Sequence, residues 1–222
     1  MQTRFVKSGI VVHVRSPKAR EPATSLSGNG HDTEVRMSSE ARLVEKHGGL
    51  IPEGEGWFVV NARDSRWWGN EKFGLITTFE GDDHGARFEE FGINIRVLEP
   101  GQPNALYHGE SGQEDFLVLF GECLLLVEGE ERRLRQWDFV HCPPMTQHIF
   151  VGAGNGPCAI LMVGTRPADP DQEELLYPVT DVALRHNAGV ERETASGDEA
   201  YAGTPDWGGG RFPEEVFPSS VS

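Results

Sequence analysis

The chain has 222 residues, 37% hydrophobic and 25% charged, which is typical of a globular protein long enough to bury a sizeable core. Its formal net charge of −15 argues against nucleic acid or an anionic membrane surface as a partner. Three cysteines, Cys123, Cys142 and Cys158, form no disulfide-framework spacing, and no apolar run approaches the ~18 residues of a membrane helix. We therefore expect a soluble, cytoplasmic protein.

The N-terminal part of the chain lacks the composition of a folded domain. Residues 16–40 are rich in Ser, Pro, Gly and charged side chains, so they bury too little apolar surface to offset the entropy of ordering. We predict a disordered leader over residues 1–40.

From Trp57 the pattern changes to short β-rich runs separated by glycine, Asp and Asn turns. No long helical period interrupts these runs, and turn signals recur every 8–12 residues, which is typical of an all-β sandwich or barrel. Glu128–Glu131 (EGEE) separates two such runs and predicts a hairpin turn. We expect one β-barrel domain over residues 50–166, followed by an acidic, partly disordered arm over residues 167–222.

The order of features in residues 93–165 resembles the two motifs of the cupin superfamily. The first motif has a Pro-Gly turn, a His-x-His pair, a Glu and then a Gly. In this chain these places hold Pro100-Gly101, His108, Glu110 in the position of the second His, Glu114 and Gly121. The second motif runs from Gly-Asp through a Pro to a His, and here it is matched by Trp137-Asp138, Pro143 and His148.

The resemblance implies an all-β double-stranded β-helix, the jelly roll or cupin barrel, with an N-terminal strand extension and a C-terminal arm. It implies a divalent transition metal (Fe, Mn, Ni, Co or Zn) bound by His108, Glu110, Glu114 and His148. Residues two apart on a strand point to one face, so His108 and Glu110 should project together. We expect Glu110 and Tyr107 as catalytic residues, and a homodimer, because cupins commonly dimerise through a sheet.

Two alternative assignments of the metal site remain open. A shifted register of the first motif places Tyr107 and Gly109 at the two histidine positions and leaves His108 outside the site. A zinc set made of His141, Cys142, His148 and Cys158 is disfavoured, because adjacent strand residues face opposite ways.

The predicted function is that of a metal-dependent enzyme acting on a small molecule, with an oxygenase favoured over an isomerase. Two imidazoles and a carboxylate with open positions are the ligand type of non-haem iron enzymes that use O₂. The alternative is a metal-free cupin that binds a small ligand as a sensor, with the same side chains serving as hydrogen-bond partners.

Overall fold

The computed structural model describes residues 38–169 and 172–214. The predicted leader, residues 1–40, lies outside the described residues except for its last three, and so does the end of the arm, residues 215–222. Within the described residues, no helix is long and apolar enough to cross a membrane.

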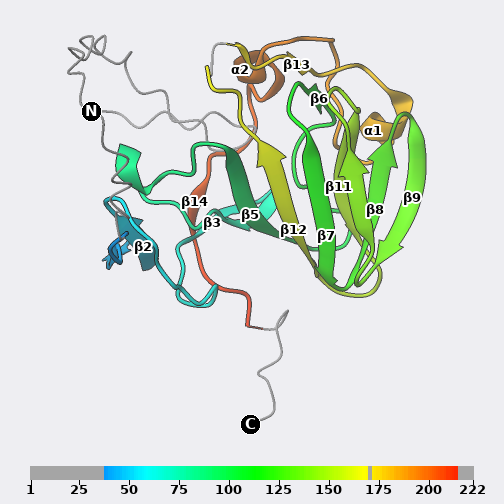
Figure 1. The fold of residues 1–222 in the computed structure, drawn as a ribbon. Helices are drawn as coiled ribbons and strands as arrows, with labels where there is room; N and C mark the ends of the chain where they lie inside the picture. Colours follow the sequence, from blue (N-terminus) through cyan, green and yellow to red (C-terminus); the bar gives the residue numbers. More distant parts are fainter. Residues whose placement is uncertain (1–37, 170–171, 215–222) are drawn as a thin grey trace, which may run out of the picture.

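Seven antiparallel strands form the larger sheet, which makes one wall of a barrel (Figure 1). Its central strands contain the continuous apolar runs FLVLF and CAILMV, so both faces of each strand are covered, one by the barrel interior and one by an outer layer. In spatial order the strands are β10 (Phe139–Cys142), β7 (Glu114–Phe120), β12 (Cys158–Thr165), β5 (Phe91–Leu98), β4 (Gly74–Thr77), β3 (Trp67–Asn70) and β14 (Gly208–Gly210).

Three strands form the facing sheet: β11 (His148–Ala153), β8 (Glu122–Val127) and β9 (Glu130–Arg135). Glu128 and Gly129 connect β8 to β9 with φ values of +48° and +80°, the left-handed pair of a type I′ hairpin turn. The segment before β6 runs along the free side of β11 through bridges from Pro103 to Val151 and from His108 to His148. The predicted all-β cupin barrel is confirmed.

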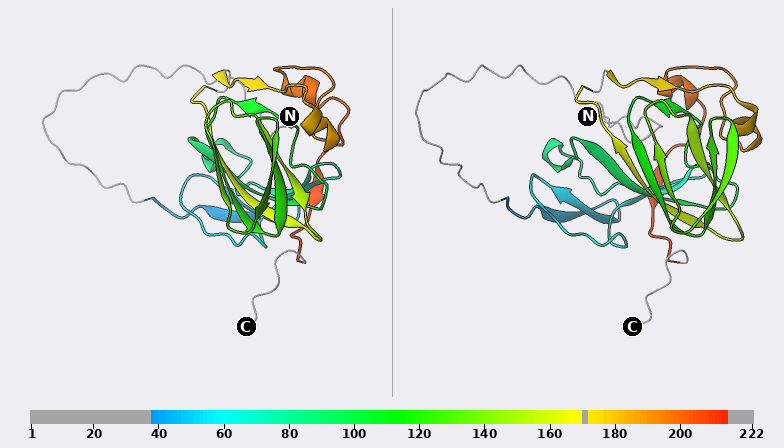
Figure 2. Two further views of the ribbon diagram at one scale, coloured as in Figure 1. Left: turned by 90° about the vertical axis from the view of Figure 1, so that its right-hand side faces the viewer. Right: turned by 45° about the vertical axis from the view of Figure 1, so that its right-hand side comes forward.

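Smaller elements surround the barrel (Figure 2). A hairpin of β1 (Arg42–Lys46) and β2 (Gly49–Glu53) lies on the side away from β8 and β9. The predicted start of the barrel domain, residue 50, falls within β2. One end of the barrel carries β6, β13, α1 and α2, and η1 lies between β4 and β5. Their bounds are β6 (Gly109–Glu110), β13 (Leu175–Leu176), α1 (Asp181–Arg185), α2 (Gly197–Ala200) and η1 (His84–Ala86).

The barrel core lies between the two sheets. Its buried members include Leu98, Phe116, Val118, Phe150 and Ile160. Gly121 closes the turn from β7 to β8 with φ +71°, and a Cβ there would lie 2.5 Å from the Pro157 carbonyl oxygen, so only glycine fits this turn.

The outer faces of both sheets are covered by the chain itself. On the outer face of the larger sheet, Phe212 from the chain beyond β14 packs against Trp67, Leu75, Val97 and Ala159 of the sheet's own strands. The C-terminal arm covers the outer face of the smaller sheet, where Tyr177 and Tyr201 are fully buried. Because these side chains join the main hydrophobic clusters, the described part of the arm is an integral part of the fold.

Candidate metal centre

Four side chains from three segments converge inside one end of the barrel. His108 directly precedes β6, Glu110 ends β6, Glu114 begins β7 and His148 begins β11. One ligand atom from each of His108, Glu110 and Glu114 lies within 4.8 Å of the others. His148 adds to this group, because its Nε2 is 3.3 Å from Glu114 Oε2.

Both imidazoles are oriented by the backbone. His108 Nδ1 is 2.7 Å from the Leu106 carbonyl oxygen, and His148 Nδ1 is 3.0 Å from the Thr146 carbonyl oxygen. A carbonyl oxygen only accepts, so Nδ1 of each ring carries the proton and Nε2 points at the carboxylates. Metal-binding histidines are commonly held by such a hydrogen bond.

Aromatic rings fix the two histidines from the sides. Tyr177 of the C-terminal arm stacks on His108 with ring centroids 5.6 Å apart, and Phe116 lies 5.1 Å from His148. The two imidazole rings are themselves 5.7 Å apart. With His108 8% and His148 3% exposed, the centre is shielded from bulk water on its histidine side.

The charged groups of this centre shift one another's protonation. Burial and the charge of Glu110 raise the pKa of Glu114 to about 8. Burial and the positive charge of His108 lower the pKa of His148 to about 4. Burial favours the neutral form of His108, but Glu110 and Glu114 outweigh it and raise the pKa of His108 to about 8. Near neutral pH, His148 therefore offers a free Nε2 lone pair, whereas Glu114 and His108 hold protons.

The residues fit a divalent metal ion. Once the protons of His108 and Glu114 are displaced, two neutral imidazole nitrogens and two carboxylates are ligands for Fe²⁺, Mn²⁺, Co²⁺, Ni²⁺ or Zn²⁺, and two carboxylates would balance the charge of the ion. Among residues 38–169 and 172–214, His108, Glu110 and Glu114 are the one group of three such side chains with ligand atoms this close together.

Tyr107 is not brought to this centre. Its side chain is 1% exposed and packs in the outer cluster with Leu126 and Ile149, and its hydroxyl accepts a hydrogen bond from the Gly129 N–H at 3.1 Å. His108 and Tyr107 face opposite sides of the segment, so the register that places Tyr107 in the site does not describe the structure.

The zinc set is not assembled either. His141 is half-exposed and its Nδ1 is 2.7 Å from Asp115 Oδ1, away from the barrel interior. Cys142 and Cys158 are buried free thiols in the barrel core.

Glu173 is a residue near the centre that the sequence motifs do not include. Burial and the charge of Glu110 raise its pKa, whereas the charge of His108 lowers it, so its carboxyl lies within electrostatic reach of both. It precedes β13 in the arm, where no cupin motif extends. Only the pairing of β13 with β6 brings it to the site.

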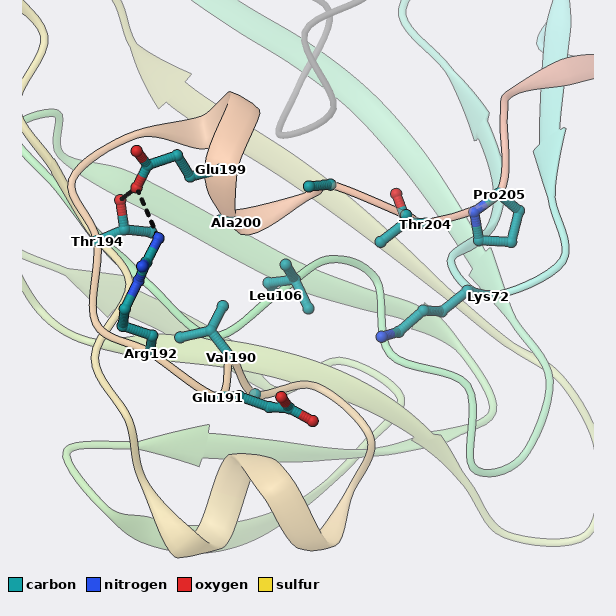
Figure 3. Close-up of a pocket in the computed structure, with 13 residues that line it drawn as sticks. Lys72, Leu106, Val190, Glu191, Arg192, Thr194, Glu199, Ala200, Thr204 and Pro205 are labelled. Carbon is teal, nitrogen blue, oxygen red and sulfur yellow. Dashed lines mark hydrogen bonds and ion pairs between the residues drawn. The ribbon is translucent and has the colours of Figure 1, made fainter.

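A hollow of about 520 Å³ lies between the arm and Lys72 (Figure 3). Glu199 of α2 accepts a hydrogen bond from the Thr194 hydroxyl at 2.7 Å and pairs with Arg192 at 3.7 Å on its rim. None of the proposed metal ligands lines it, so it is separate from the His/Glu centre.

Comparison with known proteins identifies the class. The profile of the cupin domain family matches residues 94–164, which span β5 to β12. This chain therefore carries a domain of the cupin superfamily.

Similar proteins match over a limited part of the chain. An uncharacterized protein of Methanocaldococcus jannaschii is 25% identical over 80 residues, 36% of this chain and 64% of that protein. Among solved structures, a putative sugar phosphate isomerase from Acidithiobacillus ferrooxidans is 27% identical over 46% of this chain and 62% of its own, with a TM-score of 0.39. A sugar phosphate isomerase from Silicibacter pomeroyi is 28% identical over 48% and 66%, with a TM-score of 0.41. The chain thus spans less than two thirds of each of these relatives.

Proposed function

We propose that the protein is a divalent-metal-dependent enzyme that acts on a small molecule inside the cupin barrel, and that it is an oxygenase. The observation that supports this most directly is the convergence of two backbone-oriented imidazoles on Glu110 and Glu114. Two histidines with one carboxylate are the ligand type of non-haem iron oxygenases, which keep positions open for O₂ and substrate.

Each residue has a distinct role in this proposal. His108 and His148 would hold the metal through Nε2, and Glu114 would supply the carboxylate. The bound ion would provide O₂ activation or Lewis-acid polarisation of the substrate. Glu110, with Oε2 3.7 Å from His108 Nε2, is a fourth ligand or a general base. Tyr177 and Phe116 exclude water from the two rings.

The proposal predicts an open metal position. The protein is loaded with Fe²⁺ under anaerobic conditions and then exposed to nitric oxide, an O₂ analogue. It should give the EPR signal of a high-spin iron–nitrosyl complex. The His148→Ala variant is the matched control and should give only the signal of iron in buffer.

The outcomes of that experiment separate three functions. A site that binds Fe²⁺ but not nitric oxide would contradict an oxygenase and favour an isomerase, in which Glu110 moves the proton. A protein that takes up none of Fe²⁺, Mn²⁺, Co²⁺, Ni²⁺ or Zn²⁺ would contradict both and favour the metal-free sensor.

Metal affinity should also depend on pH. A metal ion must displace the protons of Glu114 and His108, both with a pKa of about 8, whereas His148 is already neutral above about pH 4. Affinity should therefore rise by up to about two log units per pH unit from about pH 6 to about pH 8, and then level off. Co²⁺ titration followed by visible absorption measures this. A constant affinity over the range would show that these protons are not displaced.

We place the enzyme in the cytoplasm as a homodimer. The free thiols of Cys123, Cys142 and Cys158 suit a reducing compartment. Trp137 and Phe139 are 68% and 65% exposed at β10, the edge strand of the larger sheet, and an exposed apolar edge favours self-association.

A further inference from the structure

Strand β5 turns its polar face into the barrel. Val97 and Ile95 lie on its outer face and pack with Trp67. Arg96 lies on the other face, opposite Ile160 of β12, and Asn94 lies opposite Met162. Ile160 and Met162 belong to the barrel core, and residues paired across two strands share a face, so Arg96 and Asn94 point inward.

These two inward side chains carry buried polar atoms without partners. Arg96 is 5% exposed, and its Nε and Nη1 have no hydrogen-bond partner within the described residues; the same holds for the buried Oδ1 of Asn94. No carboxylate of residues 38–169 or 172–214 lies within 4.0 Å of the Arg96 guanidinium as an ion pair. An unpaired buried guanidinium is costly, so the fold retains it against a considerable penalty.

Packing of the arm does not account for the free N–H groups. Trp207 lies over Arg96 with the guanidinium carbon 5.1 Å from the ring centroid, a cation–π contact that uses the face of the guanidinium. The Nε and Nη1 hydrogens lie in the guanidinium plane, where they can bind two oxygens side by side. Burial lowers the pKa of Arg96 to about 10, so it is still a cation at neutral pH.

Sheet register places this pair on the same wall as the metal centre. Gly164 pairs with Glu114, Met162 with Phe116 and Ile160 with Val118. The row of Arg96 is therefore two rows from that of Glu114, and the row of Asn94 lies between them. Rows on one face are about 7 Å apart along the strands, so Asn94 is one row and Arg96 two rows from Glu114 on the same inner wall.

We infer that Arg96 and Asn94 form the recognition site for the anionic end of the substrate. Arg96 donates two hydrogen bonds to a carboxylate or phosphate, and Asn94 Oδ1 accepts one from a neighbouring hydroxyl. The substrate class is thus a small hydroxylated anion. This inference rests on the proposed function, because it assigns a ligand to the same barrel.

The test uses the full-length protein freed of metal with EDTA, so that anion binding is measured apart from the metal. Phosphate, acetate and glycolate are added at equal ionic strength, with chloride as the reference, and the melting temperature is recorded. At about 100 times its dissociation constant, the preferred anion should raise the melting temperature by roughly 5–10 °C. Phosphate and acetate separate the two anion classes, and glycolate should bind more tightly than acetate because it adds a hydroxyl for Asn94.

Two variants locate the effect. Arg96→Gln should bind the preferred anion at least about tenfold more weakly and keep its metal content. Asn94→Asp should also weaken anion binding, because it places a negative charge two residues from Arg96 on the same face of β5, where it repels the anion. The matched control is Arg132→Gln, which removes an exposed ion pair with Glu130 on β9 and should bind like the wild type.

The outcomes are decisive in both directions. The inference is supported if the preferred anion no longer raises the melting temperature of Arg96→Gln. If Arg96→Gln does not fold, the same result for Asn94→Asp supports it. The inference is overturned if none of the three anions raises the melting temperature of the wild type. It is also overturned if the anion raises the melting temperature of the folded variants as much as that of the wild type. Metal content, measured separately on each protein before EDTA treatment, tests the proposed function without reference to anion binding.

Discussion

Replacing His108 or His148 with alanine is expected to reduce the metal content from close to one ion per chain to less than about a tenth of that value. Each substitution removes an Nε2 that the backbone holds toward Glu110 and Glu114. Loss of a direct ligand should weaken affinity by more than about 100-fold, the upper end of the loss seen for outer-shell partners. Elemental analysis after incubation with Fe²⁺, Mn²⁺, Ni²⁺ or Zn²⁺ and gel filtration measures the result.

His141→Ala is the matched control. His141 lies on β10, seven residues before His148. Its ring is half-exposed and pairs with Asp115, and it does not point into the barrel. Its removal should leave the metal content unchanged. If His141→Ala loses the metal, or if His108→Ala keeps it while His148→Ala does not, the assignment of His108 as a ligand fails.

The motif positions could be predicted from the sequence because local geometry fixes them. Gly101 and Gly121 adopt φ values of +83° and +71°, which the turns before and after the first motif require. Trp137 stands where the family has glycine, and it adopts φ +75° as a glycine would. The turn is therefore kept by the surrounding sheets although the residue has changed, which is why spacing identified the second motif despite the substitution.

The inward-facing Asn94 and Arg96 could not be predicted in this way. In GINIRVL the isoleucines alternate with polar residues, and a strand with one solvent face normally turns its apolar side to the core. Here the apolar side is covered by Trp67 and Phe212, from β3 and from the chain beyond β14. Such cover depends on segments far away in the sequence, so alternation alone cannot show which face is inside.

The packing of the C-terminal arm could not be predicted from the sequence either. The net acidity of the arm predicts a partly disordered segment. Tyr177 and Tyr201 are nevertheless fully buried and pack edge to face with centroids 5.9 Å apart. Two aromatic anchors spaced widely in a polar segment give no periodic signal, although each buries a large apolar area.

Tyr177→Ala should therefore strongly destabilise the protein. The side chain is fully buried, stacks on His108 and contacts Tyr201, so its removal leaves a cavity between the arm and the barrel. Truncating a buried aromatic ring typically costs about 3–5 kcal/mol, which for a chain of this length corresponds to a drop in melting temperature of roughly 6–20 °C. Thermal unfolding followed by circular dichroism measures the change.

Leu184→Ala is the control for that substitution. Leu184 lies on α1 in the same arm but is 42% exposed, so its truncation should change stability by only about 0.5 kcal/mol. A melting temperature of Tyr177→Ala within about 2 °C of that of Leu184→Ala would mean that the arm is not docked on the barrel in solution. In that case the ring that holds His108 in place would be absent as well, and metal affinity should not respond to Tyr177→Ala. A docked arm predicts the opposite, with stability and metal affinity falling together, because the stacked ring is part of what fixes the His108 imidazole.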